Sequence, residues 1–436
     1  MPGVTKEEPQ LDLAIIGGGI TGLSLAAGLL SRNIHVTIYE RARQFREIGA
    51  GIGFTPNAER SMIALDPRVH TAFKKVATPN ETDLFRWVDG YTRYSDERYE
   101  ELLFEMDLGK RGFEGCHRAQ FLDELVKLIP EKNVRLGKTL QRVTEKVDGE
   151  KLLLEFEDGS TAEADAVIGC DGIRSRVRQL ILGEDNPASY PRYSHKSAFR
   201  GLVSMDRAVD AMGREKALTR HMHLGQGAHV LTFPVAMGKL LNVVAFVTDP
   251  GEWPHEEKLS APASKEEAVQ AFSGFGHVVR AVMDLLPDTL DRWAVFDTYD
   301  HPASTYMRGR MCIAGDAAHA SSPHHGAGAG TGIEDAAVLA AVLAAASETA
   351  SSLAKTKAEA LRAALATYNA IRLERSQWIV QSSRILGELY EWQYEPTGRD
   401  AAKCGAEVYW RSHQIWDYDV DDMLRRTAEE YRRRLE

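Results

Sequence analysis

Three glycines that follow a short apolar segment near the start of the chain are the residues most clearly suited to chemistry. Gly17, Gly19 and Gly22 have the spacing GxGxxG, and Glu40 lies eighteen residues after Gly22. In such a loop the first glycine allows a tight turn, the second lets the backbone approach a pyrophosphate, and the third allows the next helix to pack closely. A carboxylate at the position of Glu40 accepts hydrogen bonds from a ribose hydroxyl and repels a 2′-phosphate. The pattern therefore predicts a site for FAD or NAD rather than NADP, with a simple glycine turn as the alternative.

A second segment, Asp171-Gly172-Ile173-Arg174-Ser175, ends another apolar run and is followed by Arg176 and Arg178. Positive charge in the first turn of a helix opposes the helix dipole, so we expect a ligand or a carboxylate to compensate for it. A capped helix without a ligand is the alternative interpretation.

A third segment, Gly315-Asp316-Ala317-Ala318-His319, continues into a run of small residues from Pro323 to Gly330. Small residues let the backbone lie against a flat or phosphorylated ligand, and the N–H groups at a helix start favour negative charge. Such an arrangement would stabilise a reduced, anionic flavin. A glycine-rich hinge is the alternative, and it explains the glycines but not Asp316.

These motifs require strands and helices that hold them near one another. The segments 11–16, 20–30 and 34–39 predict a strand, a small-residue helix and a second strand, which together make a βαβ unit. Strands are also expected at 134–136, 140–147, 152–156 and 162–168, and Asp-Gly turns join the last three into a meander. Residues from about 190 to 300 favour strands, with one helix at 265–286, and the chain is predicted to be helical from residue 336 onward.

The composition excludes several classes of protein. The chain has 436 residues and a formal net charge of -10, which argues against sequence-independent binding of nucleic acid. The apolar stretch 11–30 approaches the length of a membrane span but contains Asp12 and five glycines, so no membrane segment is expected. The four cysteines are far apart and form no CxxC pair, which predicts neither a disulfide framework nor a zinc site. We therefore expect a protein of a reducing compartment, the cytoplasm.

Taken together, the three motifs, in this order and at these distances, resemble the FAD-dependent aromatic hydroxylases. These single-component flavoprotein monooxygenases include salicylate hydroxylase and p-hydroxybenzoate hydroxylase. The resemblance implies an α/β (α+β) fold, in which a β-sheet substrate domain is inserted into a Rossmann-like FAD-binding domain and a helical region follows. The expected boundaries are 1–79, 110–190 and 296–345 for the discontinuous FAD-binding domain, 80–109 and 191–295 for the β-rich substrate domain, and 346–436 for the C-terminal helical region.

The resemblance also implies which residues hold the cofactor. In such enzymes the first motif binds the ADP half of FAD, the second contacts FAD and NAD(P)H, and the aspartate of the third binds the ribityl chain. The cofactor-binding residues implied in this way are Gly17, Gly19, Gly22, Glu40, Gly53, Arg118, Asp171, Asp316 and Ala329.

Within that family the chain is most similar to fungal enzymes that hydroxylate polyketide phenols, including those that dearomatise 3-methylorcinaldehyde-like substrates. The matching stretches are 45–51, 193–196, 198–202, 297–300 and 323–328. In those relatives an arginine in the Phe-Arg-Gly-Leu strand holds the substrate phenolate, and Arg200 occupies that position here. Phe113 and Phe233 stand where different relatives have a tyrosine, which weakens the dearomatisation hypothesis more than the hydroxylase hypothesis.

Phe233 and His324 are the residues that we expect to bind substrate beside Arg200. His324 and His325 form a pair without further ligands at suitable spacing, so no metal site is predicted. The guanidinium of Arg200 stays protonated and would lower the pKa of a phenol by favouring the phenolate. A surface or interdomain salt bridge is the alternative role for Arg200.

The resemblance implies that NADH or NADPH reduces FAD, that O₂ then forms a C4a-hydroperoxyflavin, and that the electron-rich ring attacks its distal oxygen. The sequence contains no second strand–GxGxxG–helix unit, so the nicotinamide nucleotide is expected to bind transiently at the surface. The expected partners are therefore a small phenolic substrate and O₂, while the choice between NADH and NADPH and the oligomeric state stay open.

Several functions remain open at this point. The first is hydroxylation of a salicylate- or resorcylate-like phenol of secondary metabolism, with oxidative dearomatisation as one outcome. The second is decarboxylative hydroxylation to a catechol, as in salicylate hydroxylase. More distant alternatives are an FAD-dependent reductase or dehydrogenase without oxygen transfer and a non-catalytic dinucleotide-binding protein.

Overall fold

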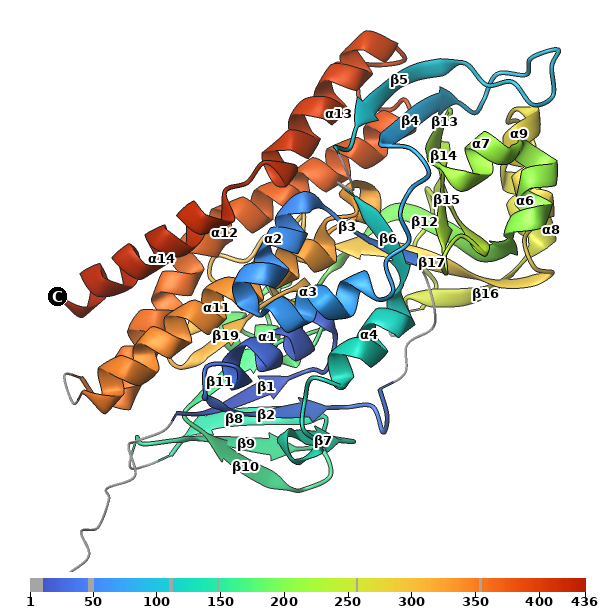
Figure 1. Cartoon of the computed structure of the whole chain (residues 1–436). Helices are drawn as coiled ribbons and strands as arrows, with labels where there is room; N and C mark the ends of the chain where they lie inside the picture. The colour runs from blue at the N-terminus through green and yellow to red at the C-terminus, as the bar shows by residue number, and fades with distance from the viewer. Residues whose placement is uncertain (1–10, 46–50, 110–112, 147–148, 256–257, 353–354) are drawn as a thin grey trace, which may run out of the picture.

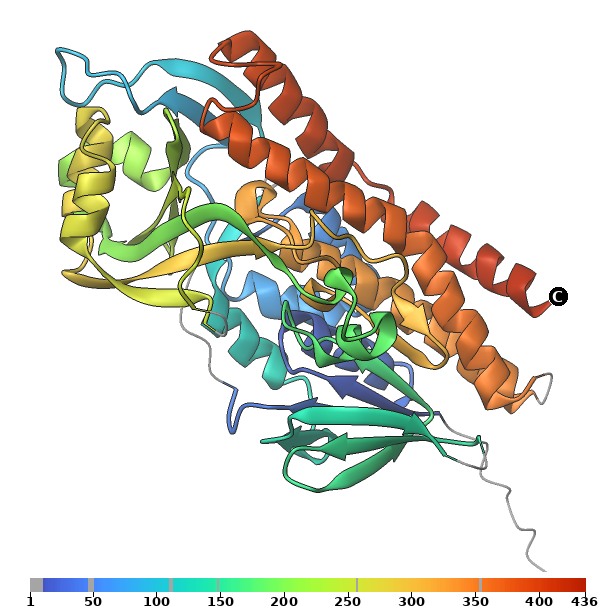
Figure 2. The ribbon, with the colours of Figure 1, turned by 180° about the vertical axis from the view of Figure 1, so that it is seen from behind.

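The computed structural model describes residues 11–45, 51–109, 113–146, 149–255, 258–352 and 355–436 (Figure 1). These residues form a six-stranded, an eight-stranded, a three-stranded and a two-stranded sheet. The last four long helices run along one side of the molecule, from the six-stranded sheet toward the eight-stranded sheet (Figures 1 and 2).

The six-stranded sheet is built from short apolar segments that are distant in sequence. β1 (Asp12–Ile16) pairs in parallel with both β2 (His35–Glu40) and β11 (Ala166–Gly169). α1 (Ile20–Leu30) makes the crossover from β1 to β2. The predicted βαβ unit is therefore present. The sheet is buried because α1 packs into the same core on one side, and the ring of Tyr39 stacks on Phe156 of the three-stranded sheet at 4.9 Å on the other. The strand order is β18 (Met307–Arg308), β19 (Met311–Ile313), β11 (Ala166–Gly169), β1 (Asp12–Ile16), β2 (His35–Glu40) and β7 (Val134–Leu136).

The single strand predicted at 162–168 is wrong, because this segment forms two strands in different sheets. β10 (Thr161–Ala164) pairs with β9 (Leu152–Phe156), which in turn pairs with β8 (Leu140–Glu145). β11 begins after Asp165 and belongs to the six-stranded sheet. The backbone N–H of Asp165 donates to the carbonyl of Asp12 at 2.7 Å, and its carboxylate accepts from the N–H of Asp12 at 2.8 Å. These two hydrogen bonds fix the point at which the chain changes sheets.

The eight-stranded sheet has a different core on each face. Side chains of one face, such as Phe199, Val230 and Val243, pack with α6 (Met205–Met212), α7 (Arg214–Leu218), α8 (Lys265–Ala271) and α9 (His277–Asp284). Side chains of the other face, such as Met222 and Leu224, pack with the C-terminal helices. The strand order is β16 (Ser260–Ser264), β17 (Thr289–Asp297), β12 (Arg192–Ser204), β15 (Leu240–Thr248), β14 (Ala228–Val235), β13 (Arg220–Leu224), β4 (Leu84–Asp89) and β5 (Leu102–Asp107).

The single helix predicted at 265–286 is also wrong, because α8 and α9 are separated by residues 272–276. The N–H of Gly276 donates to the carbonyl of Gly90 at 2.9 Å, and a Cβ at this position would lie 2.8 Å from the carbonyl oxygen of Thr92. A continuous helix would hold neither this hydrogen bond nor this close approach of two backbones. The apolar periodicity of the segment therefore predicted helix correctly but missed the break.

The long C-terminal helices are α11 (Gly328–Ser351), α12 (Lys357–Tyr390), α13 (Ala401–Trp416) and α14 (Val420–Leu435). α11 begins eight residues before the predicted residue 336, inside the glycine-rich run. α12 begins with a capping box formed by Thr356 and Glu359. Among the described residues, α11 is the one helix long and apolar enough to cross a membrane, and 78% of the relevant window is buried inside the protein.

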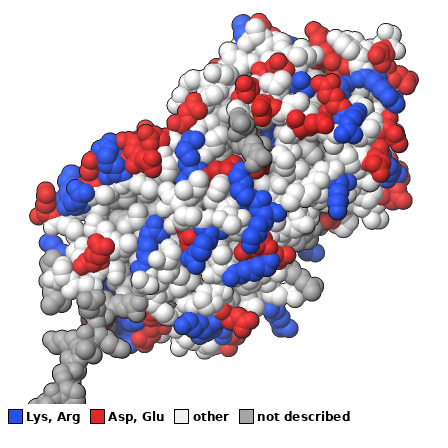
Figure 3. All heavy atoms as spheres, viewed as in Figure 1, with Lys and Arg blue, Asp and Glu red and all other residues white. Residues whose placement is uncertain are grey.

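The remaining elements connect the two large sheets. β3 pairs with β6 in an antiparallel ribbon, and α2 packs on α11. Their bounds are β3 (Gly51–Phe54), α2 (Pro56–Leu65), α3 (Pro67–Lys74), β6 (Glu114–His117), α4 (Arg118–Val126), α5 (Arg176–Leu182) and α10 (Asp316–His319). On the face shown in Figure 3, basic and acidic side chains are interspersed among neutral ones.

Candidate functional site

The glycine loop after β1 leaves a cradle that side chains would fill. Gly17 has a φ of +103°, and a Cβ there would lie 2.3 Å from the carbonyl oxygen of Cys170. A Cβ at Gly22 would lie 2.1 Å from the carbonyl oxygen of Gly17, whereas one at Gly19 would meet nothing within 4 Å. Gly17 and Gly22 are thus required by packing, and Gly19 borders open space at the first turn of α1. That turn carries no acidic residue and no side-chain cap, so its N–H groups suit a pyrophosphate.

Glu40 ends β2 beside this loop. One carboxylate oxygen accepts from the N–H of Gly18 at 2.7 Å, and the other accepts from the N–H of Ala42 at 2.7 Å. These bonds fix the carboxylate at the edge of the cradle, where the sequence predicts that it binds a ribose.

Asp171 compensates for the positive first turn of α5. Its carboxylate accepts from the N–H groups of Arg176 at 2.7 Å and Val177 at 3.1 Å, and from the hydroxyl of Ser175 at 2.5 Å. Burial nevertheless raises the pKa of the Asp171 carboxyl above its usual value. The sequence predicted that a ligand or a carboxylate compensates for this positive charge, and the structure places the Asp171 carboxylate there. Contact between Asp171 and FAD stays a prediction.

Arg178 joins the second motif to the third, a link that the sequence analysis missed. The side chain is buried and donates to the carbonyls of Ala188 at 2.6 Å, Ala317 at 3.0 Å and Ala318 at 2.7 Å. The last two carbonyls are more than 130 residues away in sequence, so no local pattern identifies them.

The third motif forms a turn next to the N-terminus of α11, at a glycine with positive φ. Gly315 has a φ of +63°, and a Cβ there would lie 2.5 Å from the hydroxyl of Thr21 in α1. Asp316 follows it with an exposed side chain, and a Cβ at Gly328 would lie 3.9 Å from one of its carboxylate oxygens. α11 carries no acidic residue in its first turn, so Asp316 stands beside N–H groups free to bind an anionic ligand.

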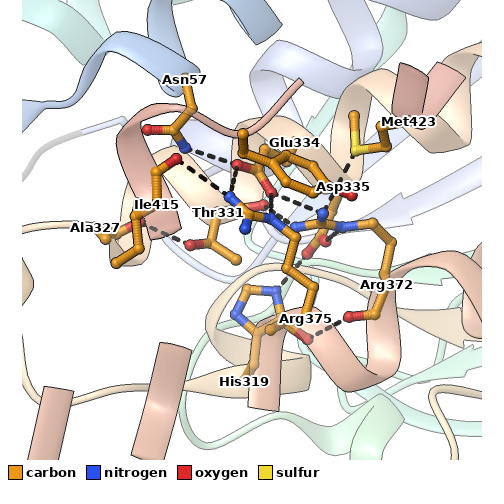
Figure 4. A network of polar contacts seen from close by, with 12 residues as sticks. Asn57, His319, Ala327, Thr331, Glu334, Asp335, Arg372, Arg375, Ile415 and Met423 are labelled. Atoms are coloured by element: carbon orange, nitrogen blue, oxygen red, sulfur yellow. Dashed lines mark hydrogen bonds and ion pairs between the residues drawn. The ribbon is translucent and has the colours of Figure 1, made fainter. Parts of the chain in front are cut away.

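A buried network of charged side chains contacts this turn at Gly315 and His319 (Figure 4). One carboxylate oxygen of Asp335 accepts from the N–H of Gly315 at 2.9 Å and bonds Nε2 of His319 at 2.5 Å, while the other accepts from Nε of Arg372 at 2.8 Å. The adjacent Glu334 pairs with Arg372 at 2.7 Å and Arg375 at 2.8 Å. Both carboxylates lie fully inside the protein, with α12 supplying the guanidinium groups.

The charges in this network balance, which is the condition for burying them. Burial alone would raise the pKa values of the two carboxyl groups. The charges of Arg375 and Arg372 outweigh burial and lower the pKa of Glu334 to about 2. His319 and Arg372 likewise hold the pKa of Asp335 well below its usual range. Both groups are therefore anionic in the folded protein at neutral pH.

Arg200 lies on the inner face of the eight-stranded sheet, the face opposite to Phe199. It is opposite Val244 of β15, which is opposite Leu231 of β14, and Phe233 lies two residues further along β14. The Nε of Arg200 is buried without a hydrogen-bond partner, and its guanidinium lies 5.4 Å from the centre of the Trp293 ring. No carboxylate pairs with Arg200 among the described residues.

Arg200 keeps its charge despite this burial. Burial, and secondly the like charge of Arg118 at the start of α4, lowers the pKa of the Arg200 guanidinium to about 10. Two cations therefore act on this part of the sheet. The predicted cofactor residue Gly53 lies nearby on β3, where a Cβ would lie 2.8 Å from the ring of Phe113.

His324 packs against the same face of the sheet. Its ring lies 5.2 Å from His229 of β14 and 5.0 Å from Phe246 of β15, and Nδ1 bonds the hydroxyl of Ser322 at 2.9 Å. Burial holds the pKa of His324 well below its usual value, so the ring is neutral. The structure thus brings Arg200, Phe233 and His324 to one face, while Ala329 lies in the first turn of α11 on the cofactor side.

Sequence reasoning also missed a buried cluster at the end of α12. The carboxylate of Glu391 bonds Nζ of Lys196, accepts from the hydroxyl of Thr248, and lies 3.1 Å from Nδ1 of His229. Lys196, Thr248 and His229 come from three different strands, and Glu391 directly follows the last residue of α12.

Of the stretches that carry the family resemblance, residues 46–50 lie outside the described part of the chain. No group of three metal-ligating side chains occurs among the residues that the structure describes.

A mostly parallel sheet with a glycine cradle after its first strand is the architecture of dinucleotide-binding proteins, and here it is combined with a second sheet that carries Arg200 on its inner face. Comparison with known proteins identifies the family. The model of the FAD-binding domain family matches residues 10–383, and the chain belongs to this family. Over all 436 residues it is 98% identical to the FAD-dependent monooxygenase pigN of Monascus ruber, covering 100% of both chains.

Two further relatives define the type of monooxygenase. Salicylate hydroxylase asL1 of Sarocladium schorii is 43% identical over 441 residues, covering 97% of this chain and 92% of that protein. The structure of a salicylate hydroxylase substrate complex superposes with a TM-score of 0.83 at 33% identity, covering 97% of this chain and 98% of the other. The chain is an FAD-dependent monooxygenase of the salicylate hydroxylase type, and the predicted fold class, family and FAD cofactor are confirmed.

The glycines of the cradle give a test of the cofactor site. We expect Gly22→Ala to destabilise the protein both with and without FAD, because its Cβ meets a backbone oxygen that cannot move away. Gly19→Ala, whose Cβ meets nothing within 4 Å, should leave the apoprotein melting temperature unchanged and weaken FAD binding. Thermal unfolding of apoprotein and holoprotein, with FAD titration by fluorescence, measures both. Full FAD affinity in Gly19→Ala would contradict the position given to the pyrophosphate.

The charge network gives a second test, because its two adjacent carboxylates have different neighbours. Asp335→Asn places an N–H group against either Gly315 or Arg372, so we expect the FAD dissociation constant to rise about tenfold, or roughly 1.4 kcal/mol. Glu334→Gln, the matched control, also disturbs Arg372, together with Arg375, but does not touch Gly315. It should lower stability and change FAD affinity much less. Equal losses of FAD affinity in the two variants would show that Asp335 does not hold the turn.

The same network predicts how stability depends on pH. Glu334 has an ordinary pKa of 4.5 and one of about 2 in the folded protein, so the stability it contributes is complete above pH 4.5 and is lost as the pH falls toward 2. The wild-type protein should therefore lose stability more steeply over this interval than Glu334→Gln. Urea unfolding at a series of pH values measures the two slopes, and parallel curves would rule out this contribution.

Proposed function

We propose that this chain hydroxylates a phenolic aromatic of the salicylate or resorcylate kind, such as those of fungal polyketide secondary metabolism. NADH or NADPH supplies the electrons, and O₂ supplies the oxygen atom. The observation that carries the proposal is Arg200, a partly buried guanidinium that has no paired carboxylate among the described residues and lies on the inner face of the eight-stranded sheet.

Such a cation fits the needs of a hydroxylated phenol. Oxygen transfer to a ring requires electron density, which a phenolate supplies at its ortho and para positions. With a pKa of about 10, Arg200 is positively charged at neutral pH and favours the phenolate over the phenol. FAD, when bound, supplies the oxygen-transfer chemistry. The protein binds the phenolate oxygen, orients the ring and excludes water.

The residues around Arg200 favour an aromatic ligand. Trp293 and Phe233 present rings on the same face of the sheet, and His324 is held neutral there. A neutral imidazole beside the site adds no charge, and its Nε2 is buried without a hydrogen-bond partner among the described residues. The similarity to a structure solved as a salicylate hydroxylase substrate complex supports an aromatic substrate.

The outcome of hydroxylation depends on what the attacked carbon carries. A substrate with a carboxylate at that carbon loses CO₂ and gives a catechol, whereas an alkyl group there yields a dearomatised product. Phe113 and Phe233 offer no hydroxyl to hold a phenolate, so orientation depends on Arg200 and its neighbours. We favour simple hydroxylation, and the mass of the product decides among the three.

The proposal also covers the domain boundaries, the residues that contact FAD, the binding of the nicotinamide nucleotide and the location of the enzyme. We propose that the cofactor half comprises 1–79, 110–190 and 296–345, and that the substrate half comprises 80–109 and 191–295. The helical region 346–436 covers both. Asp316, Glu40, Asp171, Arg118, Gly53 and Ala329 contact FAD, the nicotinamide nucleotide binds transiently, and the enzyme works in the cytoplasm.

The test of the proposed function is Arg200→Ala, with Arg200→Lys as the conservative variant. Loss of a hydrogen bond to a charged group costs about 1.5–3 kcal/mol, so phenol-stimulated NAD(P)H oxidation should fall roughly 10- to 150-fold in kcat/KM while FAD content is unchanged. The product formed from a panel of phenolic acids and aldehydes is read by mass.

Arg292→Ala is the matched control for this test. Arg292 lies opposite Phe199 on the outer face of the neighbouring strand and pairs with Asp249 at 2.8 Å. Its loss should leave turnover close to the wild-type value. Full turnover in Arg200→Ala would refute the assigned role, and anaerobic turnover with an organic acceptor would instead support a reductase.

A further inference from the structure

A second arginine, Arg220, lies on the same inner face of the sheet and takes no part in the function proposed above. It begins β13, where it is opposite Phe85 of β4 and adjacent to Phe233 of β14. The side chain is 2% exposed. Its single hydrogen bond within the described residues runs from a terminal nitrogen to the carbonyl of Phe113 at 3.0 Å, and Nε has no partner.

Arg220 is a buried cation without a paired anion among the described residues. Burial lowers the pKa of its guanidinium to about 9, and Glu114 is the one carboxylate whose charge opposes this. Glu114 pairs with Lys74 at 2.8 Å, and Lys74 also pairs with Glu59 at 2.7 Å, whereas no carboxylate among the described residues forms an ion pair with Arg220. A buried charge without a counter-ion is unfavourable unless a ligand supplies one.

Aromatic rings surround this guanidinium. Its central carbon lies 3.9 Å from the centre of the Phe113 ring, 5.5 Å from Phe85 and 5.6 Å from Phe233. These rings stabilise the cation through their π faces but accept no conventional hydrogen bond from it. The guanidinium is therefore held in place with a donor still unused.

Asn242 supplies a second unused donor on the other side of Phe233. It is opposite Phe233 on β15, and its carbonyl oxygen accepts from the N–H of Gly51 at 3.1 Å. That bond fixes the orientation of the amide and leaves its nitrogen buried without a partner. Donors from two strands thus flank one aromatic ring, an arrangement that suits an oxygen acceptor.

The two arginines mark the two ends of one stretch of the inner face. Arg200 and Arg220 are separated by three strand spacings and by two residues along the sheet. At about 4.8 Å per strand and 3.4 Å per residue, their Cα atoms are roughly 16 Å apart. Each guanidinium lies at one end of this span, with Trp293 beside Arg200 and Phe85 beside Arg220, and Phe233 and Asn242 lie on the strands between them.

We propose that Arg220, with Asn242, binds a second oxygen of the substrate at the end opposite to the phenolate. The substrate class is then a phenol that carries a strongly accepting oxygen, a carboxylate or an acyl carbonyl, on the far side of its ring. This inference rests on the proposed function, since it assumes that Arg200 holds the phenolate. It makes Arg220 a specificity-determining residue rather than a member of the reacting group.

The test compares ligands that differ only in this second group. The probes are 2,4-dihydroxybenzoate, 2,4-dihydroxybenzaldehyde and resorcinol, titrated against the oxidised holoenzyme by the change in flavin absorbance, without turnover. In Arg220→Met the dissociation constants of the acid and the aldehyde should rise roughly 10- to 100-fold, while that of resorcinol changes less than about threefold. The larger of the first two losses identifies carboxylate or carbonyl as the preferred group.

Two variants and a control separate recognition from folding. Asn242→Asp keeps the acceptor for Gly51 and removes the donor, so it should weaken the acid more than resorcinol even if Arg220→Met fails to fold. Arg220→Lys should restore part of the affinity for the acid. Arg310→Met removes a buried arginine that bonds the carbonyls of Glu150 and Asp165, and it should alter stability without discriminating among the probes.

Each result decides the matter. Equal losses for all three probes, or none, in Arg220→Met and Asn242→Asp would overturn the role of Arg220 and leave the proposed function standing. A wild-type enzyme that binds none of the probes and oxidises no NAD(P)H in their presence would overturn the proposed function, and this inference with it.

Discussion

The hydrogen bond from the backbone of Gly315 to the carboxylate of Asp335 is the constraint on which the rest of the site depends. It holds a glycine in the left-handed region at a point where a side chain would strike Thr21. The carboxylate can be buried there because it pairs with Arg372 and forms a hydrogen bond with His319. The turn that presents Asp316 is therefore fixed by a helix that begins some forty residues later in the chain.

The strict alternation of side chains in the eight-stranded sheet creates the second half of the site. Phe199 and its neighbours on the outer face fill a conventional apolar core. Arg200, one residue further along, faces inward with Asn242 and Arg220 from other strands. One face of a sheet thus serves stability and the other recognition, and a shift of one residue in register would exchange the two.

Sequence patterns predicted the parts of this structure that depend on neighbours along the chain. The βαβ unit, the glycine spacing and Glu40 follow from local periodicity and turn chemistry. The strand break at Asp165 and the helix break before Gly276 escaped prediction because their causes, Asp12 and Gly90, lie 153 and 186 residues away. The contacts of Asp335, Arg178 and Arg220 were missed for the same reason, since an arginine or aspartate in a sequence shows nothing of its partner.

Helix α12 connects two buried ionic clusters, with Arg372 among the residues that hold the cofactor turn and Glu391 immediately after its last residue among strands of the substrate sheet. They are nineteen positions apart in sequence, a distance of roughly 28 Å at 1.5 Å per residue. Because α12 is held by an ionic cluster near each sheet, hinge motion between the two sheets would break one of these clusters. A cofactor lobe excised without α12 would keep Asp335 without Arg372, and a substrate lobe excised without it would keep Lys196 without Glu391.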